Sequence, residues 1–158
     1  MTTPHSLSEL SAQGQAFIDK LTQHQPAPAV LNAAIQDKLY ATAVQTLKAS
    51  QYPQAFALFG VLFSQNTCDG RYLSGMAHAA QGGGDMSVAL PLHALALSVA
   101  TEPEPYVLDL AQALIAIQST ALAKVLLELI GPDSKFAGDA AQLSQRALAV
   151  DALLEHAA

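Results

Sequence analysis

The sequence has little charge and lacks several residues that mark particular protein classes. Only 13% of its 158 residues are charged, and it contains one cysteine and no tryptophan. Cys68 has no partner for an internal disulfide and no neighbouring residues at metal-ligand spacing. The stretch from Met1 to His5 lacks the basic and apolar segments of an exported precursor. These absences favour a reducing compartment, and we expect the protein to reside in the cytoplasm.

Basic residues and long apolar runs are also scarce. Seven Lys and Arg stand against thirteen Asp and Glu, which gives a net charge of −6. Nucleic acids and anionic membranes require clustered positive charge, so neither is an expected partner. The most apolar stretch, Val107 to Ile130, is interrupted by Asp109, Lys124 and Glu128. A spanning helix needs about 20 nearly uncharged residues, and we therefore predict no direct insertion into a membrane.

Alanine, leucine and glutamine are abundant, and this composition favours helix. Hydrophobic residues make up 51% of the chain, and residues with low helix propensity are few. A length of 158 residues fits one domain or one array of repeats. The surplus of apolar residues must cover a groove, a subunit interface or both.

Small residues recur with a period of 34. Ala55, Ala89 and Ala123 are spaced by 34 residues, and so are three alanines twelve positions before them, namely Ala43, Ala77 and Ala111. Leu39, Leu73 and Val107 repeat at the same interval. This is the tetratricopeptide period, in which two antiparallel helices touch at small residues. The sequence thus predicts an all-α fold with three tandem helix pairs, arranged as a superhelical array.

Turn and capping residues separate the predicted helices. Pro53 and Pro105 are placed in first turns, and Asp85 is a candidate N-cap. Pro91 falls inside a predicted helix, where we expect a kink or a late helix start.

Two further helices flank the repeats. Residues 7 to 23 are amphipathic, with a Pro-Ala-Pro break at Pro26 to Pro28, and residues 136 to 155 form a final apolar-rich segment. We predict an N-terminal arm over 1–30 that either caps the array or dimerises, repeats over 31–135 (about 36–69, 70–103 and 104–135), and a C-terminal capping helix over 136–158.

No pattern in the chain indicates catalysis or metal binding. The five histidines form no HExxH motif and no pair spaced by four residues, so we predict no metal site. The run from Gly82 to Gly84 follows a helix and lacks the Lys-Ser or Lys-Thr of a phosphate-binding loop. We predict a protein that is not an enzyme and has no cofactor.

Such an array can bind an extended peptide on the concave surface formed by the first helix of each pair. Side chains at fixed repeat positions point there, and amides such as Gln81 and Gln112 are placed to bond the backbone of a client. An alternative for Tyr40 and Leu47 is packing against the N-terminal helix. The predicted groove residues are Tyr40, Val44, Leu47, Arg71, Tyr72, Ser74, His78, Gln81, Leu108, Gln112 and Ile115.

Three segments together resemble a known family. Leu39-Tyr40-Ala41-Thr42-Ala43, Asp69-Gly70-Arg71-Tyr72-Leu73 and Glu104-Pro105-Tyr106 are similar in order and spacing to the three repeats of class II type III secretion chaperones, which bind translocator proteins of Gram-negative bacteria. The resemblance covers about residues 31 to 130. Val44 and Leu47 stand where family members frequently carry aromatic residues.

The resemblance implies a cytoplasmic bacterial chaperone and a homodimer. Its partners would be hydrophobic translocator proteins, held through an extended segment with proline and aliphatic anchors and kept soluble until secretion. The main alternative is a general repeat adaptor that assembles a bacterial complex without protecting an unstable client.

Overall fold

The computed structural model describes residues 4, 6–23 and 29–157, and within them every regular element is a helix. The predicted break at Pro26–Pro28 lies outside the described residues. None of the described helices is long and apolar enough to cross a membrane. The eight helices are α1 (Leu7–Thr22), α2 (Ala33–Lys48), α3 (Tyr52–Gln65), α4 (Gly70–Gly82), α5 (Met86–Val99), α6 (Glu104–Ala116), α7 (Thr120–Leu127) and α8 (Ala137–Ala157).

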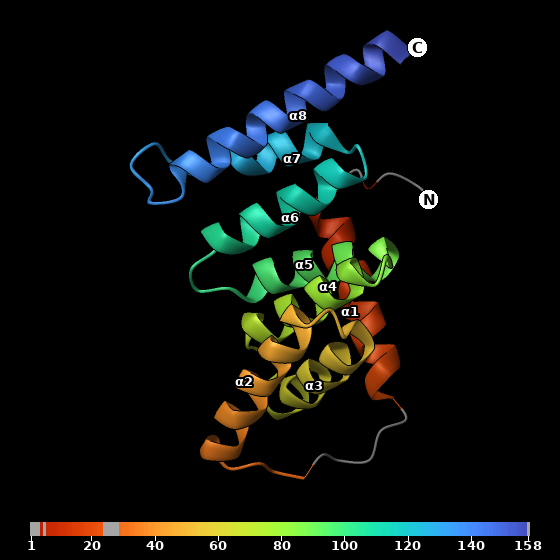
Figure 1. The fold of residues 1–158 in the computed structure, drawn as a ribbon, viewed down its shortest axis with the longest axis vertical. Coiled ribbons are helices and arrows are strands. Elements are labelled where there is room, and N and C mark those ends of the chain that lie inside the picture. The colour runs from red at the N-terminus through yellow and green to blue at the C-terminus, as the bar shows by residue number, and fades with distance from the viewer. Residues whose placement is uncertain (1–3, 5, 24–28, 158) are drawn as a thin grey trace.

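Helices α2 to α7 form three antiparallel pairs. Helix α2 packs on α3, α4 on α5, and α6 on α7, while α3 contacts α4 and α5 contacts α6 between the pairs. Figure 1 shows the pairs stacked in chain order along the long axis, with α8 at one end. The predicted all-α fold of three helix pairs with flanking helices is confirmed.

The alanines of the 34-residue period lie where the helices touch. All six have an exposed fraction of 0%: Ala43, Ala55, Ala77, Ala89, Ala111 and Ala123. A larger side chain at any of these positions would separate two helix backbones, because the space beside the methyl group is filled. The period therefore reflects the packing between helices rather than the abundance of alanine.

The helix starts agree with the capping residues in the sequence. The Asp85 side chain accepts a hydrogen bond from the Val88 backbone N–H and caps α5. Pro53 and Pro105 lie in the first turns of α3 and α6. A backbone N–H at these positions would have no acceptor within the helix, so proline removes no hydrogen bond there. A late start caused by Pro91 was the wrong expectation, since α5 begins at Met86 and contains this proline in its interior.

Helix α1 does not precede α2 as an extra layer of the stack. It packs across α5 instead, in the middle of the array. Gly14 permits this approach, because a Cβ at this position would lie 2.3 Å from the Pro91 carbonyl oxygen. The Ser11 hydroxyl donates a hydrogen bond to the carbonyl of Ala94 at 3.3 Å.

Helix α8 covers the end of the third pair. It contacts both α6 and α7, and Leu143 and Ala147 are buried against that pair. The Lys124 ammonium group lies 2.7 Å from the Asp151 carboxylate, and the Thr120 hydroxyl donates to the same carboxylate. Val150 also packs on this core, whereas Leu148 and Leu153 of the same helix are 59% and 69% exposed.

Candidate functional site

A hollow of about 270 Å³ opens on the face formed by the first helices of the pairs. Its residues come from α2, α3, α4 and α6, and among the described residues none comes from α1. The hollow, here called the groove, is lined by Tyr40, Val44, Leu47, Phe59, Arg71, Ser74, Gly75, His78, Pro105, Tyr106 and Asp109.

One side of the groove is aromatic. The Tyr40 ring lies 6.0 Å from the ring centroids of Phe59 and of Tyr72, edge-on to the former and tilted to the latter. The Arg71 guanidinium lies 5.4 Å from the Tyr40 ring centre and is held by the Asp69 carboxylate at 2.7 Å. These contacts fix the rings, so this wall is preformed for apolar side chains.

The Phe59 ring reaches the groove because Gly75 faces it. A Cβ at Gly75 would lie 2.5 Å from the Phe59 ring, well inside van der Waals contact. The glycine in α4 therefore creates the space in which the buried Phe59 ring of α3 supports Tyr40 on a face otherwise built from first helices.

The other side of the groove is polar. His78 Nδ1 donates a hydrogen bond to the Ser74 carbonyl at 2.8 Å, and His78 Nε2 lies 3.5 Å from Asp109 Oδ1. The Ser74 hydroxyl donates to Asp109 Oδ2 at 3.3 Å. The carboxylate of Asp109 raises the pKa of His78 against the effect of burial. Burial opposes ionisation of Asp109, yet His78 and Ser74 outweigh it and lower the pKa of that carboxyl.

His93 of α5 lies beneath this polar side. Its ring is 1% exposed and meets the His78 ring edge-on, with 4.9 Å between centroids. Nε2 of His93 donates to the Gln81 side-chain oxygen at 3.0 Å. Burial, followed by the neighbouring His78, lowers the pKa of His93 to about 4, so the ring is neutral at pH 7.

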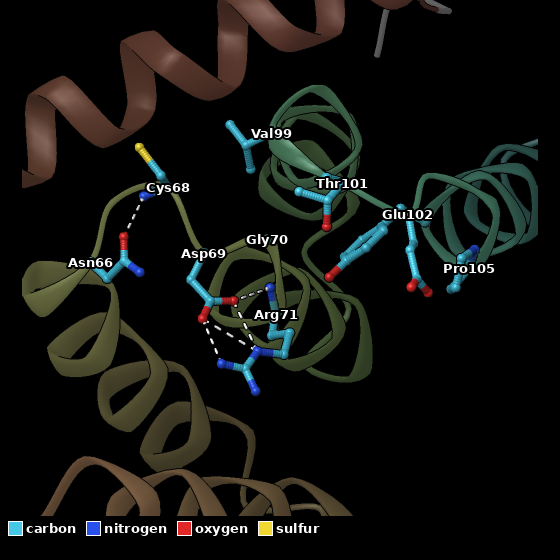
Figure 2. Close-up of a pocket in the computed structure, with 11 residues that line it drawn as sticks. Asn66, Cys68, Asp69, Gly70, Arg71, Val99, Thr101, Glu102 and Pro105 are labelled. Carbon is cyan, nitrogen blue, oxygen red and sulfur yellow. Dashed lines mark hydrogen bonds and ion pairs between the residues drawn. The ribbon is translucent and has the colours of Figure 1, made fainter. Parts of the chain in front are cut away.

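A second hollow, of about 440 Å³, adjoins the groove between the α3–α4 turn and the α5–α6 loop. Figure 2 shows Asn66, Cys68 and Asp69 on one side of it and Thr101, Glu102 and Pro105 on the other. Arg71, Pro105 and Tyr106 line both hollows. The concave face thus offers a continuous path from α2 to the loop before α6.

Six of the eleven predicted groove residues line the groove: Tyr40, Val44, Leu47, Arg71, Ser74 and His78. Tyr72 is 6% exposed and supports the aromatic wall from beneath. The alternative packing of Tyr40 and Leu47 on the N-terminal helix is not seen, because both line the groove and α1 packs on α5.

The predicted residues nearer the C-terminus are placed differently. Ile115 is 4% exposed and belongs to the core covered by α8, so the prediction that it faces a client is wrong. Leu108 is partly buried against the same core, and Gln112 is exposed outside the groove. The Gln81 amide oxygen accepts a hydrogen bond from His93 of α5, and Gln81 does not line the groove.

Sequence reasoning missed Phe59, Gly75, Tyr106 and Asp109 as groove residues. A signal for Asp109 was available: the equivalent positions one and two periods earlier are Gly75 and Ala41, so a single repeat carries a charge there. The role of Phe59 depends on the missing Cβ of Gly75, which the period alone does not reveal.

No protein-family model matches the chain, and no curated protein matches its sequence. Solved structures do match in fold. The type III secretion chaperone SycD of Yersinia enterocolitica, in complex with a peptide of the translocator YopD, matches with a TM-score of 0.66 and 19% identity over 76% of this chain and 95% of that chain.

Two further structures of the Yersinia enterocolitica translocator chaperone SycD agree with it. One matches with a TM-score of 0.67 and 19% identity over 79% of this chain and 89% of that chain. The other, an alternative dimer, matches with a TM-score of 0.68 and 20% identity over 78% of this chain and 97% of that chain. The chain therefore has the helical, tetratricopeptide-like fold of the Yersinia type III secretion translocator chaperone SycD.

Proposed function

We propose that this protein is a bacterial cytoplasmic chaperone that binds hydrophobic type III secretion translocator proteins and performs no chemistry of its own. The observation that carries the proposal is the groove: a preformed aromatic wall beside a polar side, on a fold shared with a chaperone solved with a translocator peptide. An extended client segment would place aliphatic or proline side chains against Tyr40, Val44 and Leu47. This binding lowers the free concentration of an aggregation-prone client and needs no ATP.

The groove assignment is tested by placing a charge where the client's apolar side chain would lie. We expect Val44→Asp to weaken binding of an extended peptide with proline and leucine anchors by roughly tenfold or more, since an unpaired carboxylate would be desolvated. The measurement is fluorescence anisotropy with a labelled peptide.

Val61→Asp is the matched control, because Val61 is 46% exposed and lies on α3 outside the groove. It should bind the peptide as the wild type does. Circular dichroism must show both variants folded. A folded Val44→Asp protein with unchanged affinity would contradict the groove assignment.

Co-expression separates the chaperone from a general repeat adaptor. A chaperone makes a hydrophobic translocator soluble only when the two are produced together, whereas an adaptor binds a partner that is already soluble alone. The readout is the soluble fraction of the translocator with the wild type, with Val44→Asp and without this chain. Equal solubility in all three would favour the adaptor.

The proposal includes a homodimer, and one of the SycD structures is described as an alternative dimer. Exposed apolar side chains on α7 (Val125), just after it (Leu129) and on α8 (Leu148 and Leu153) form a surface that a second subunit could cover. Light scattering over a concentration series should show twice the 16.5 kDa mass of the chain. A persistent 16.5 kDa species would refute the dimer.

A further inference from the structure

The fold brings together three potential metal ligands that are far apart in sequence. His78 of α4, His93 of α5 and Asp109 of α6 each place one donor atom within 4.8 Å of the other two. His78 and Asp109 line the groove, and His93 is buried below them. Two imidazoles and a carboxylate are a donor set used by three-ligand zinc sites.

His78 and Asp109 form an ion pair, and their spacing also fits two ligands of one metal ion. Their nearest atoms, Nε2 and Oδ1, are 3.5 Å apart, longer than the roughly 2.7–3.2 Å of an N–H···O bond. Two donors at about 2.0–2.1 Å from one tetrahedral ion are separated by about 3.3 Å. An ion between them would therefore need little movement of either side chain.

A second group holds each candidate ligand by its other polar atom. His78 Nδ1 donates to the Ser74 carbonyl, leaving Nε2 toward Asp109. The Ser74 hydroxyl holds Asp109 Oδ2, leaving Oδ1 toward His78. One ring nitrogen of His93 is bonded to Gln81, which leaves the other to bind. Such outer contacts fix the tautomer and orientation of metal ligands.

We propose that His78, His93 and Asp109 bind one Zn²⁺ ion, or a related divalent transition metal, in the polar side of the groove. Three protein ligands leave a further coordination position, which would face the groove where His78 and Asp109 are exposed. That position is available to water or to a donor group of a bound peptide. The inference does not depend on the proposed function, since it concerns only side chains of this chain.

The test is calorimetric titration of Zn²⁺ into the untagged, metal-free full-length protein near neutral pH, in a buffer that does not chelate metals. We expect one ion per chain. Asp109→Asn and His78→Gln should each weaken the affinity by roughly tenfold or more. Both residues are partly exposed, so these variants should fold even where replacement of the buried His93 fails.

Two matched controls exclude binding elsewhere. His156→Gln removes a histidine at the exposed end of α8, and Cys68→Ser removes the exposed thiol. Both should bind Zn²⁺ as the wild type does. Replacement of Zn²⁺ by Co²⁺ should give visible absorption bands of a four-coordinate ion, which Asp109→Asn diminishes.

Two results would overturn the proposal. One is the absence of one-to-one Zn²⁺ binding tighter than about millimolar, the range of adventitious surface sites. The other is equal affinity for the wild type, Asp109→Asn and His78→Gln, which would place the ion at another site.

Discussion

At the scale of single residues, two glycines make opposite demands on the packing. Gly14 of α1 faces the backbone of α5, whereas nothing lies within 4 Å of a Cβ built at Gly60 of α3. The same substitution therefore meets a rigid carbonyl at one position and open space at the other.

We expect Gly14→Ala to destabilise the protein by about 1–3 kcal/mol, because α1 must move away from α5. Gly60→Ala should instead stabilise it by about 0.5–1 kcal/mol, since alanine favours helix. Urea unfolding followed by circular dichroism measures both. A Gly14→Ala protein as stable as the wild type would contradict the packing described for α1.

The buried His93 predicts how stability depends on pH. The pKa of His93 is lowered to about 4, below the roughly 6.5 of an unfolded histidine. Between these values the unfolded chain takes up a proton that the folded chain excludes, so stability decreases as the pH falls from about 6.5 to about 4. The full shift corresponds to on the order of 3 kcal/mol.

His78 acts in the opposite direction. Its pKa is raised by Asp109, so its contribution is present at low pH and is lost as the pH rises through the folded-state pKa. The pKa of Asp109 is lowered, which places its own effect mainly below about pH 4. The measurement is the free energy of unfolding in urea between about pH 4 and 7, with EDTA present. We expect this free energy to fall less steeply toward acid pH in His93→Gln than in the wild type, and more steeply in His78→Gln. Identical pH profiles for the three proteins would contradict this assignment.

At the scale of helices, α8 has one face that belongs to the core and one that does not. Leu143 is 8% exposed, and Leu148 on the same helix is 59% exposed. We expect Leu143→Ala to cost about 2–3 kcal/mol and Leu148→Ala less than about 0.5 kcal/mol in thermal or urea unfolding. Comparable losses at both positions would mean that the exposed face of α8 is covered in solution.

The existence of the helices could be predicted, but not the partner that covers each one. The period of 34 predicted contacts at Ala43, Ala77 and Ala111, because the same crossing recurs in each pair. The amphipathic pattern of residues 7 to 23 predicted which side of α1 is buried. A pattern within one helix does not indicate which other helix covers that side. For the same reason the burial of Ile115 under α8 was not foreseen.

The candidate site divides in a similar way. Tyr40, Val44 and Leu47 were found because repeat positions set which side chains face the groove. The cluster of His78, His93 and Asp109 was not, since these residues lie on three helices and meet only through the angles at which the helices cross. A search for metal-ligand motifs detects spacing within one segment and not this kind of proximity.

At the scale of the whole molecule, α1 contributes to both hydrophobic cores, as α5 does. Leu10 is buried with residues of α5 to α8 in one core, and Ile18 with residues of α2 to α5 in the other. In a simple repeat array each unit contacts only the next, and loss of stability stays local. Here a change in α1 reaches both ends.

We expect Leu10→Ala and Ile18→Ala each to lower amide hydrogen-exchange protection in both cores, with a cost of about 2–4 kcal/mol. Leu21→Ala is the control on the same helix, because Leu21 is 37% exposed. If each variant lowered protection only in its own core, α1 would not couple them.

The position of α1 also bears on how the chain is synthesised. The Ser11 hydroxyl donates a hydrogen bond to the carbonyl of Ala94, 83 residues later in the chain. Gly14 packs against the Pro91 carbonyl. A ribosome makes α1 before α5, so the part of its apolar face that packs on α5 lacks its native partner until α5 has left the exit tunnel. During that interval the nascent protein carries an unprotected amphipathic segment of its own.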